Sequence, residues 1–188
     1  MVFLANLWLP VLLSAAFVFI VSSIIHMVIP IHGGDFKKLS REDKVLEEMR
    51  AQGIKPGDYM FPFPGSMKEM GSPEMQEKYG LGPVGFLTVV PDGVPAIGKS
   101  LVQWFLYSIL ISIFTAYIAA LVLACGAEAM MVFRVTGAIA VLGYAFSNVQ
   151  NSIWKGQSWV VTLKFMLDGV VYGVVTGGTF AWLWPEAG

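Results

Sequence analysis

The sequence predicts an all-α membrane protein with four transmembrane helices and a long cytoplasmic loop between helices 1 and 2. Of its 188 residues, 56% are hydrophobic and only 13% are charged, whereas a soluble domain carries about 25% charged residues. Four apolar stretches reach the roughly 20 residues that a helix needs to cross the hydrocarbon layer. One long polar segment separates the first stretch from the other three.

The predicted elements follow from these apolar stretches and from the prolines that bound them. Pro30 ends the first helix and Pro185 follows the fourth. The expected order is helix 1 within 1–30, the loop at 31–98, helix 2 at 99–124, helix 3 at 129–150 and helix 4 at 158–184.

The loop contains one predicted amphipathic helix near 40–52, with Ser40 as its N-cap and Gly53 as its end. The following stretch is rich in proline and glycine, which predicts turns and extended segments with one helical turn after Ser72. The apolar stretch 84–98, "VGFLTVVPDGVPAIG", fits either a short hairpin or a segment in the lipid headgroup layer, because proline prevents it from spanning.

Most lysines and arginines lie in this loop, so the positive-inside rule places the loop in the cytoplasm and both termini outside. Arg134, near the outer end of helix 3, is the exception. The expected location is the bacterial cytoplasmic (inner) membrane.

Helix 4 carries two rows of residues, and within each row the residues are four positions apart. Glycines form one row, and a second row is polar and includes Lys164, Asp168 and Tyr172. Small residues spaced by four let two helix backbones approach closely in a membrane. Helix 2 offers a matching row, so we expect helices 2 and 4 to pair, within one chain or between chains, through Gly169, Gly173, Gly177, Ser108, Ser112, Ala116 and Ala120.

Asp168 lies about nine residues into helix 4, roughly 13 Å from its start, where an ionised carboxylate needs a partner. An i,i+4 ion pair with Lys164 is the simplest expectation. A relay of protons or ions, or a site for a lipid headgroup or a partner's charge, are the alternatives. Other polar side chains lie at a similar depth, and the candidate intramembrane polar cluster comprises Lys164, Asp168, Tyr172, His26, Asn148 and Asn151.

The sequence predicts no catalytic residue, no metal site and no cofactor. "HMVIPIHGGD" contains His26, His32 and Asp35, but Pro30 and two glycines break the helix that would fix their geometry. Phosphate-binding, dinucleotide-binding, zinc-peptidase and nucleophile motifs are absent from the sequence. Cys125 is the single cysteine, and the near balance of 12 basic and 13 acidic residues gives no sign of nucleic-acid binding.

Two segments, "EDKVLEEMRAQGIKPGDYMFP" and "SIWKGQSWVVTLKFMLDGVVYGVVTGGTFAWLWP", resemble a family of uncharacterised bacterial four-helix integral membrane proteins. The resemblance extends through most of the chain. It implies a bacterial inner-membrane location and four spans, and it carries no activity or catalytic residue with it.

The first functional hypothesis is a non-catalytic accessory subunit that packs into a larger membrane assembly through its small-residue helix faces. Its partners are the lipid bilayer and either other membrane proteins or further copies of itself. The alternative is a small oligomeric transporter or channel, coupled to protons or ions, that uses Asp168 and Lys164. A membrane enzyme acting on lipid is disfavoured, because polar residues at the interface are few and scattered.

Overall fold

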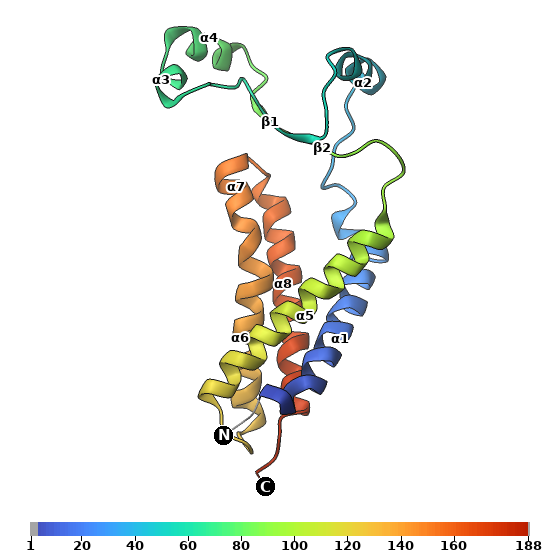
Figure 1. The fold of residues 1–188 in the computed structure, drawn as a ribbon, viewed down its shortest axis with the longest axis vertical. Coiled ribbons are helices and arrows are strands. Elements are labelled where there is room, and N and C mark those ends of the chain that lie inside the picture. The colour runs from blue at the N-terminus through green and yellow to red at the C-terminus, as the bar shows by residue number, and fades with distance from the viewer. Residues whose placement is uncertain (1–3, 188) are drawn as a thin grey trace.

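In the computed structural model, which describes residues 4–187, four long helices form a bundle and a small mixed region lies beyond one of its ends (Figure 1). The long helices are α1 (Trp8–Met27), α5 (Ile97–Val122), α6 (Ala129–Ala145) and α8 (Trp159–Trp182). The shorter elements are η1 (Leu4–Leu7), η2 (Pro30–His32), α2 (Glu42–Ala51), β1 (Gly57–Phe61), α3 (Met67–Met70), α4 (Pro73–Leu81), β2 (Gly85–Val89), η3 (Phe146–Asn148) and α7 (Val149–Lys155).

The structure confirms a mostly helical chain with four helices long and apolar enough to cross a membrane. Their most apolar windows have mean hydropathies between 1.5 and 2.3. The third span differs in detail from the expected 129–150. A 3-10 turn follows Ala145, and α7 then continues to Lys155, where Gly156 ends it in a left-handed conformation at φ 66°.

The glycine row of α8 packs against α6. A Cβ placed on Gly169 would lie 2.5 Å from the Cα of Ala145, and one on Gly177 would lie 2.9 Å from the carbonyl oxygen of Phe133. The glycines therefore allow the close contact that the sequence predicted, because no larger residue fits between the two backbones.

Within the chain, helices 2 and 4 do not form the predicted pair. Helix 2, α5, contacts α1 instead, where the hydroxyls of Ser14 and Ser112 are hydrogen-bonded at 2.9 Å. Ala116 is fully buried with Leu7 and Val11 in the same contact region. A row of small residues indicates that some helix comes close, but α6 has small residues of its own, including Gly137 and Ala145, and it takes the position beside α8.

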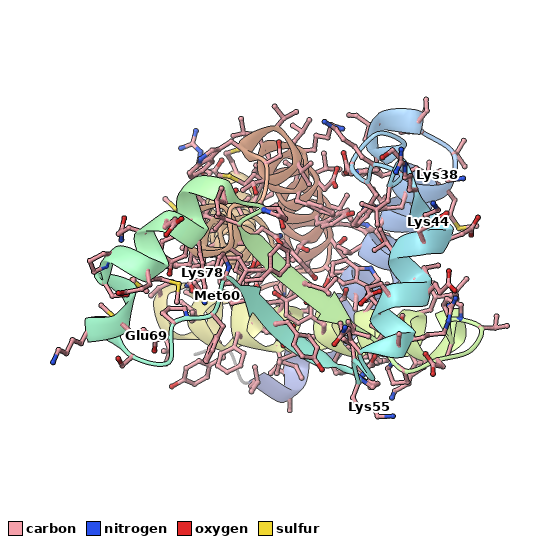
Figure 2. The ribbon with its side chains drawn as sticks, turned by 90° about the horizontal axis from the view of Figure 1, so that it is seen from above. Lys38, Lys44, Lys55, Met60, Glu69 and Lys78 are labelled. Atoms are coloured by element: carbon pink, nitrogen blue, oxygen red, sulfur yellow. The ribbon has the colours of Figure 1, made fainter. Side chains whose placement is uncertain are left out.

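The connection between α1 and α5, residues 28–96, forms the region beyond the bundle. Its strands β1 and β2 are antiparallel, with Gly57 opposite Val89 and Phe61 opposite Gly85. The short hairpin, one of the two expectations for 84–98, does not form. β2 pairs instead with β1, which lies before α3 in the chain. Figure 2 shows the α1–α5 connection from above, with Lys38, Lys55 and Lys78 of this connection labelled.

The helical turn predicted after Ser72 is the start of α4, and Ser72 caps this helix because its hydroxyl accepts a hydrogen bond from the amide of Met75 at 3.2 Å. The Ser40 cap is wrong: α2 begins at Glu42, and Arg41 occupies the cap position without a side-chain hydrogen bond.

The close contact of α6 and α8 predicts that Gly173→Leu destabilises the bundle. A Cβ at this position would lie 2.3 Å from a methyl group of Val141 and 3.1 Å from the carbonyl oxygen of Gly137. We expect a loss of about 1–3 kcal/mol, measured as a lower thermal midpoint of the detergent-solubilised protein. Gly178→Leu on the same helix is the matched control, because a Cβ there meets no atom within 4 Å. Equal losses in both variants would contradict the packing.

Candidate functional site

Five polar side chains meet at the end of the bundle that faces the α1–α5 connection, and we call them the charge cluster: His26, His32, Asp35, Lys164 and Asp168. They come from the last turn of α1, from the turn that follows it and from α8. Pro30 ends the helical path and begins the short 3-10 helix η2. The chain bends back there, and the ring of His32 stacks on that of His26 with centroids 4.5 Å apart and planes within 4°.

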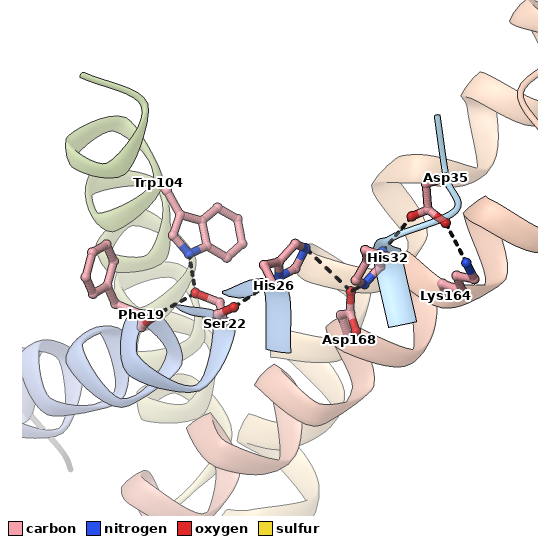
Figure 3. Close-up of polar contacts among 8 residues, drawn as sticks. All are labelled: Phe19, Ser22, His26, His32, Asp35, Trp104, Lys164 and Asp168. Atoms are coloured by element: carbon pink, nitrogen blue, oxygen red, sulfur yellow. Dashed lines mark hydrogen bonds and ion pairs between the residues drawn. The ribbon is translucent and has the colours of Figure 1, made fainter. Parts of the chain in front are cut away.

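His32 lies between two carboxylates (Figure 3). Its Nε2 is 2.9 Å from Oδ2 of Asp168, and its Nδ1 is 2.6 Å from Oδ2 of Asp35. A neutral imidazole has one donor nitrogen only, so these two contacts require either a further proton in the cluster or another cation on Asp168.

Lys164 completes the cluster from the other side, because its Nζ donates to Oδ1 of Asp35 at 2.5 Å. The expected ion pair of Lys164 with Asp168 on the same helix is therefore wrong. Lys164 pairs instead with a residue 129 positions earlier in the chain. Asp168 contacts the histidines, at 2.9 Å from His32 and 3.9 Å from His26.

Burial makes these partners necessary. The side chains of Asp35 and Asp168 are only 3% and 5% exposed. An unpaired buried carboxylate carries a large desolvation cost, which nearby cations and hydrogen-bond donors offset. Hydrogen bonds from Lys164 and then from His32 hold the pKa of Asp35 below its ordinary value of 3.8.

A cavity of about 480 Å³ opens beside the cluster and is bordered by side chains of all four long helices. Aromatic rings of Trp104, Tyr107, Tyr144 and Tyr172 form part of its lining and contact one another at centroid distances of 5.5–6.0 Å. The polar lining includes Ser22, Ser23, His26, Ser147, Asn148 and Asp168.

Two polar groups of this lining differ in how they are satisfied. The indole nitrogen of Trp104 donates to the hydroxyl of Ser22 at 2.8 Å. The hydroxyl of Tyr172, on a residue that is 4% exposed, has no hydrogen-bond partner among residues 4–187. A buried tyrosine hydroxyl normally has a partner, so this hydroxyl is available to a ligand or water in the cavity.

The structure brings together most of the polar residues that the sequence singled out. His26, Asn148, Asp168 and Tyr172 border the cavity, and Lys164 joins them through Asp35. Asn151 does not belong to this lining. Its carbonyl oxygen instead accepts hydrogen bonds from the backbone beyond α7.

Sequence reasoning did not include His32 and Asp35 in the cluster. It treated the Pro30 break and the glycines as a loss of fixed geometry, whereas the break is what returns the chain to α8. Two features of the sequence could have indicated their place in the cluster. Asp168 needs a partner, and His32 and Asp35 follow directly after helix 1.

Comparisons of the chain with protein-family models, with curated proteins and with solved structures find no match. The geometry of this chain is therefore the basis for inferring its function. The cluster can hold a proton or bind a cation, and the adjoining cavity can admit a small ligand. The cluster contains no serine or cysteine nucleophile.

The corrected ion pair predicts a specific energetic coupling. Lys164→Met should lower the thermal midpoint by more than Lys38→Met does, because Lys38 forms an exposed pair with Glu42 at 3.7 Å. Asp35→Asn in the Lys164→Met background should cost less than it does alone, because the lysine that it pairs with is already gone. The measurement is a double-mutant cycle of thermal midpoints. Coupling of Lys164 to Asp168 but not to Asp35 would overturn the observed pairing.

Proposed function

We propose that the chain is a non-catalytic, multi-pass protein of the bacterial inner membrane that serves as an accessory subunit of a larger membrane assembly. The observation that carries this proposal is the small number of buried apolar side chains in the α1–α5 connection. Within residues 28–96, all of which the structure describes, Met75 is the only buried apolar side chain.

This region leaves much apolar surface exposed. Phe63, Leu81 and Phe86 are 71%, 79% and 50% exposed, and the sheet has two strands only. An isolated pair of strands is marginally stable in water, and an apolar surface of this kind is typical of a binding face. A groove of about 700 Å³ runs along the strands and reaches Lys155 at the end of α7. A protein partner that fills this groove would supply the core that the region lacks.

The orientation of the chain belongs to the same proposal. Eleven of the 12 lysines and arginines lie on the side of the α1–α5 connection or near that end of the helices, and Arg134 is the exception. The positive-inside rule then places residues 31–98 in the cytoplasm and both termini outside. The exposed aliphatic side chains of α5, such as Leu106, Leu110 and Leu121, would face lipid.

A proton- or ion-coupled conduit is the second candidate, and the linked contacts from Asp168 through His32 and Asp35 to Lys164 favour it. The other half of the bundle argues against a path through one chain. The hydroxyls of Thr136, Thr176 and Thr179 donate to carbonyls of their own helices. An apolar cluster that includes Phe180 and Trp184 is packed at that end.

The accessory role predicts a protein contact on the sheet. A photoreactive phenylalanine analogue at position 86 should form a covalent adduct of defined mass with another protein in native membranes. The same analogue at position 114 is the matched control. The two phenylalanines are similarly exposed, at 50% and 56%, but Phe114 lies on α5 and should yield lipid adducts. Immunoblotting and mass spectrometry identify the products.

The outcomes of this experiment separate the alternatives. Lipid adducts alone at position 86 would show that the headgroup layer covers the sheet, and an adduct of twice the chain's mass would show self-association. Either result contradicts the accessory role. Adducts that resist external protease in intact spheroplasts would place the region in the cytoplasm, whereas their digestion would reverse the orientation.

The conduit candidate has its own test. Proteoliposomes of the purified chain should conduct protons no faster than empty liposomes, because the threonine hydroxyls in the other half of the bundle donate to their own helices and an apolar cluster is packed at its end. The measurement is the change of an internal pH-sensitive dye after a pH jump. Flux in the parent that Asp168→Asn abolishes and Asp43→Asn preserves would establish the conduit, since Asp43 is exposed on α2 and distant from the cluster.

A further inference from the structure

The charge cluster contains three possible ligand atoms that lie close together. One ring nitrogen each of His26 and His32 and a carboxylate oxygen of Asp168 all lie within 4.8 Å of one another. We propose that these three residues bind one divalent transition-metal ion, with zinc or ferrous iron as the fitting class. The inference goes beyond the accessory role and does not depend on it.

Both histidines present the nitrogen that a metal needs. Nδ1 of His26 is 3.0 Å from the carbonyl oxygen of Ser22, which only accepts, so this nitrogen must carry the proton. Nδ1 of His32 is 2.6 Å from Asp35, and a proton on it makes a strong hydrogen bond to the carboxylate. Each neutral ring then has a lone pair on Nε2. A histidine that donates its other ring N–H to a carbonyl or carboxylate oxygen is the usual arrangement around a bound metal.

The distances around Asp168 favour a cation among the three residues. Nε2 of His26 lies 3.9 Å from Oδ2 of Asp168, the same oxygen that lies 2.9 Å from Nε2 of His32. An unprotonated Nε2 of His32 at this distance repels the carboxylate oxygen. Protonating His32 alone removes that repulsion but leaves Nε2 of His26 unused, and protonating both rings would place two imidazolium ions in a stack with centroids 4.5 Å apart. A single metal ion satisfies all three donors at once.

The site requires the ring of His26 to turn, because two parallel stacked rings, with planes within 4°, cannot direct both Nε2 lone pairs at one ion. Metal–ligand bonds of about 2.0–2.1 Å in a tetrahedral site place two donor atoms about 3.3 Å apart. The observed separations of 2.9 and 3.9 Å lie on either side of this value. His26 has the most room to adjust, because its side chain is 40% exposed, whereas His32 is held by Asp35.

The charges and the donor types select the class of ion. Lys164 pairs with Asp35, so Asp168 is the carboxylate left to neutralise the metal. Two imidazoles and one carboxylate, without a thiolate, suit zinc and ferrous iron. They do not suit calcium or magnesium, which prefer oxygen ligands.

Three protein ligands leave a further coordination position for water or a small ligand. His26 and Asp168 both border the 480 Å³ cavity, so that position can open into it. The hydroxyl of Tyr172, one helical turn from Asp168, is buried without a partner among residues 4–187 and also borders this cavity. A water or ligand atom on the metal would give this hydroxyl its hydrogen bond.

Cobalt binding tests the proposal directly, since Co²⁺ occupies zinc sites and absorbs visible light there. The full chain is purified in mild detergent through an affinity tag that lacks histidine, stripped with a chelator and titrated with Co²⁺. We expect one Co²⁺ per chain, with the visible absorption of a tetrahedral N/O site and displacement by one equivalent of Zn²⁺. His32→Gln and Asp168→Asn should each weaken binding at least tenfold, and Asp35→Asn should weaken it about 10- to 100-fold. Asp43→Asn, on exposed α2, is the control that should leave binding unchanged.

Helical circular dichroism and a monodisperse elution profile establish that each variant is folded. The parent chain also provides a test that needs no variant, because X-ray absorption of its zinc-loaded form should show two imidazole ligands. The absence of stoichiometric Co²⁺ and Zn²⁺ binding at micromolar concentration in the folded parent would overturn the proposal, and His32 would then be an imidazolium ion between two carboxylates. Binding that persists in the His26→Gln, His32→Gln double variant would overturn it as well.

Discussion

The need of the buried Asp168 carboxylate for positive or hydrogen-bonding partners is the constraint on which this end of the fold depends. α8 supplies no partner of its own, since Lys164 one turn earlier is bound to Asp35. His32 therefore has to reach Asp168 from beyond α1, and it does so because Pro30 ends the helical path and begins a tight turn. The Asp168–His32 contact holds the first residues of the long α1–α5 connection against α8.

Close packing of α6 and α8 supports the same site from the other side. Gly169, next to the buried carboxylate, allows the backbone of α6 to approach at Ala145. Tyr144, the preceding residue of α6, then contacts Tyr172 with ring centroids 5.5 Å apart. The glycine row and the polar row of α8 are thus parts of one arrangement, in which the first brings in α6 and the second borders the cavity.

Properties that depend on one helix at a time could be predicted from the sequence. Hydropathy indicates four spans, and the spacing of Gly169, Gly173 and Gly177 indicates a close helix contact. The partner of that contact could not be predicted, because small residues occur on both α5 and α6. The partners of Asp168 and Lys164 were missed for a related reason: the nearest opposite charge in sequence is one turn away, whereas the nearest in space comes from another segment.

The cluster also determines how the bundle and the region outside it are connected. Residues 28–35 join α1 to the rest of the connection. Within this segment, His32 and Asp35 bind side chains of α8. Beyond Asp35 the chain has almost no buried apolar surface until α5 begins. The start of the connection is therefore held against α8 by a few polar contacts. The stability of these contacts depends on the charge of each partner. Removing one partner leaves a buried carboxylate without a compensating charge. A change in the charge held between His32 and Asp168 thus acts first on the segment that joins α1 to the rest of the α1–α5 connection.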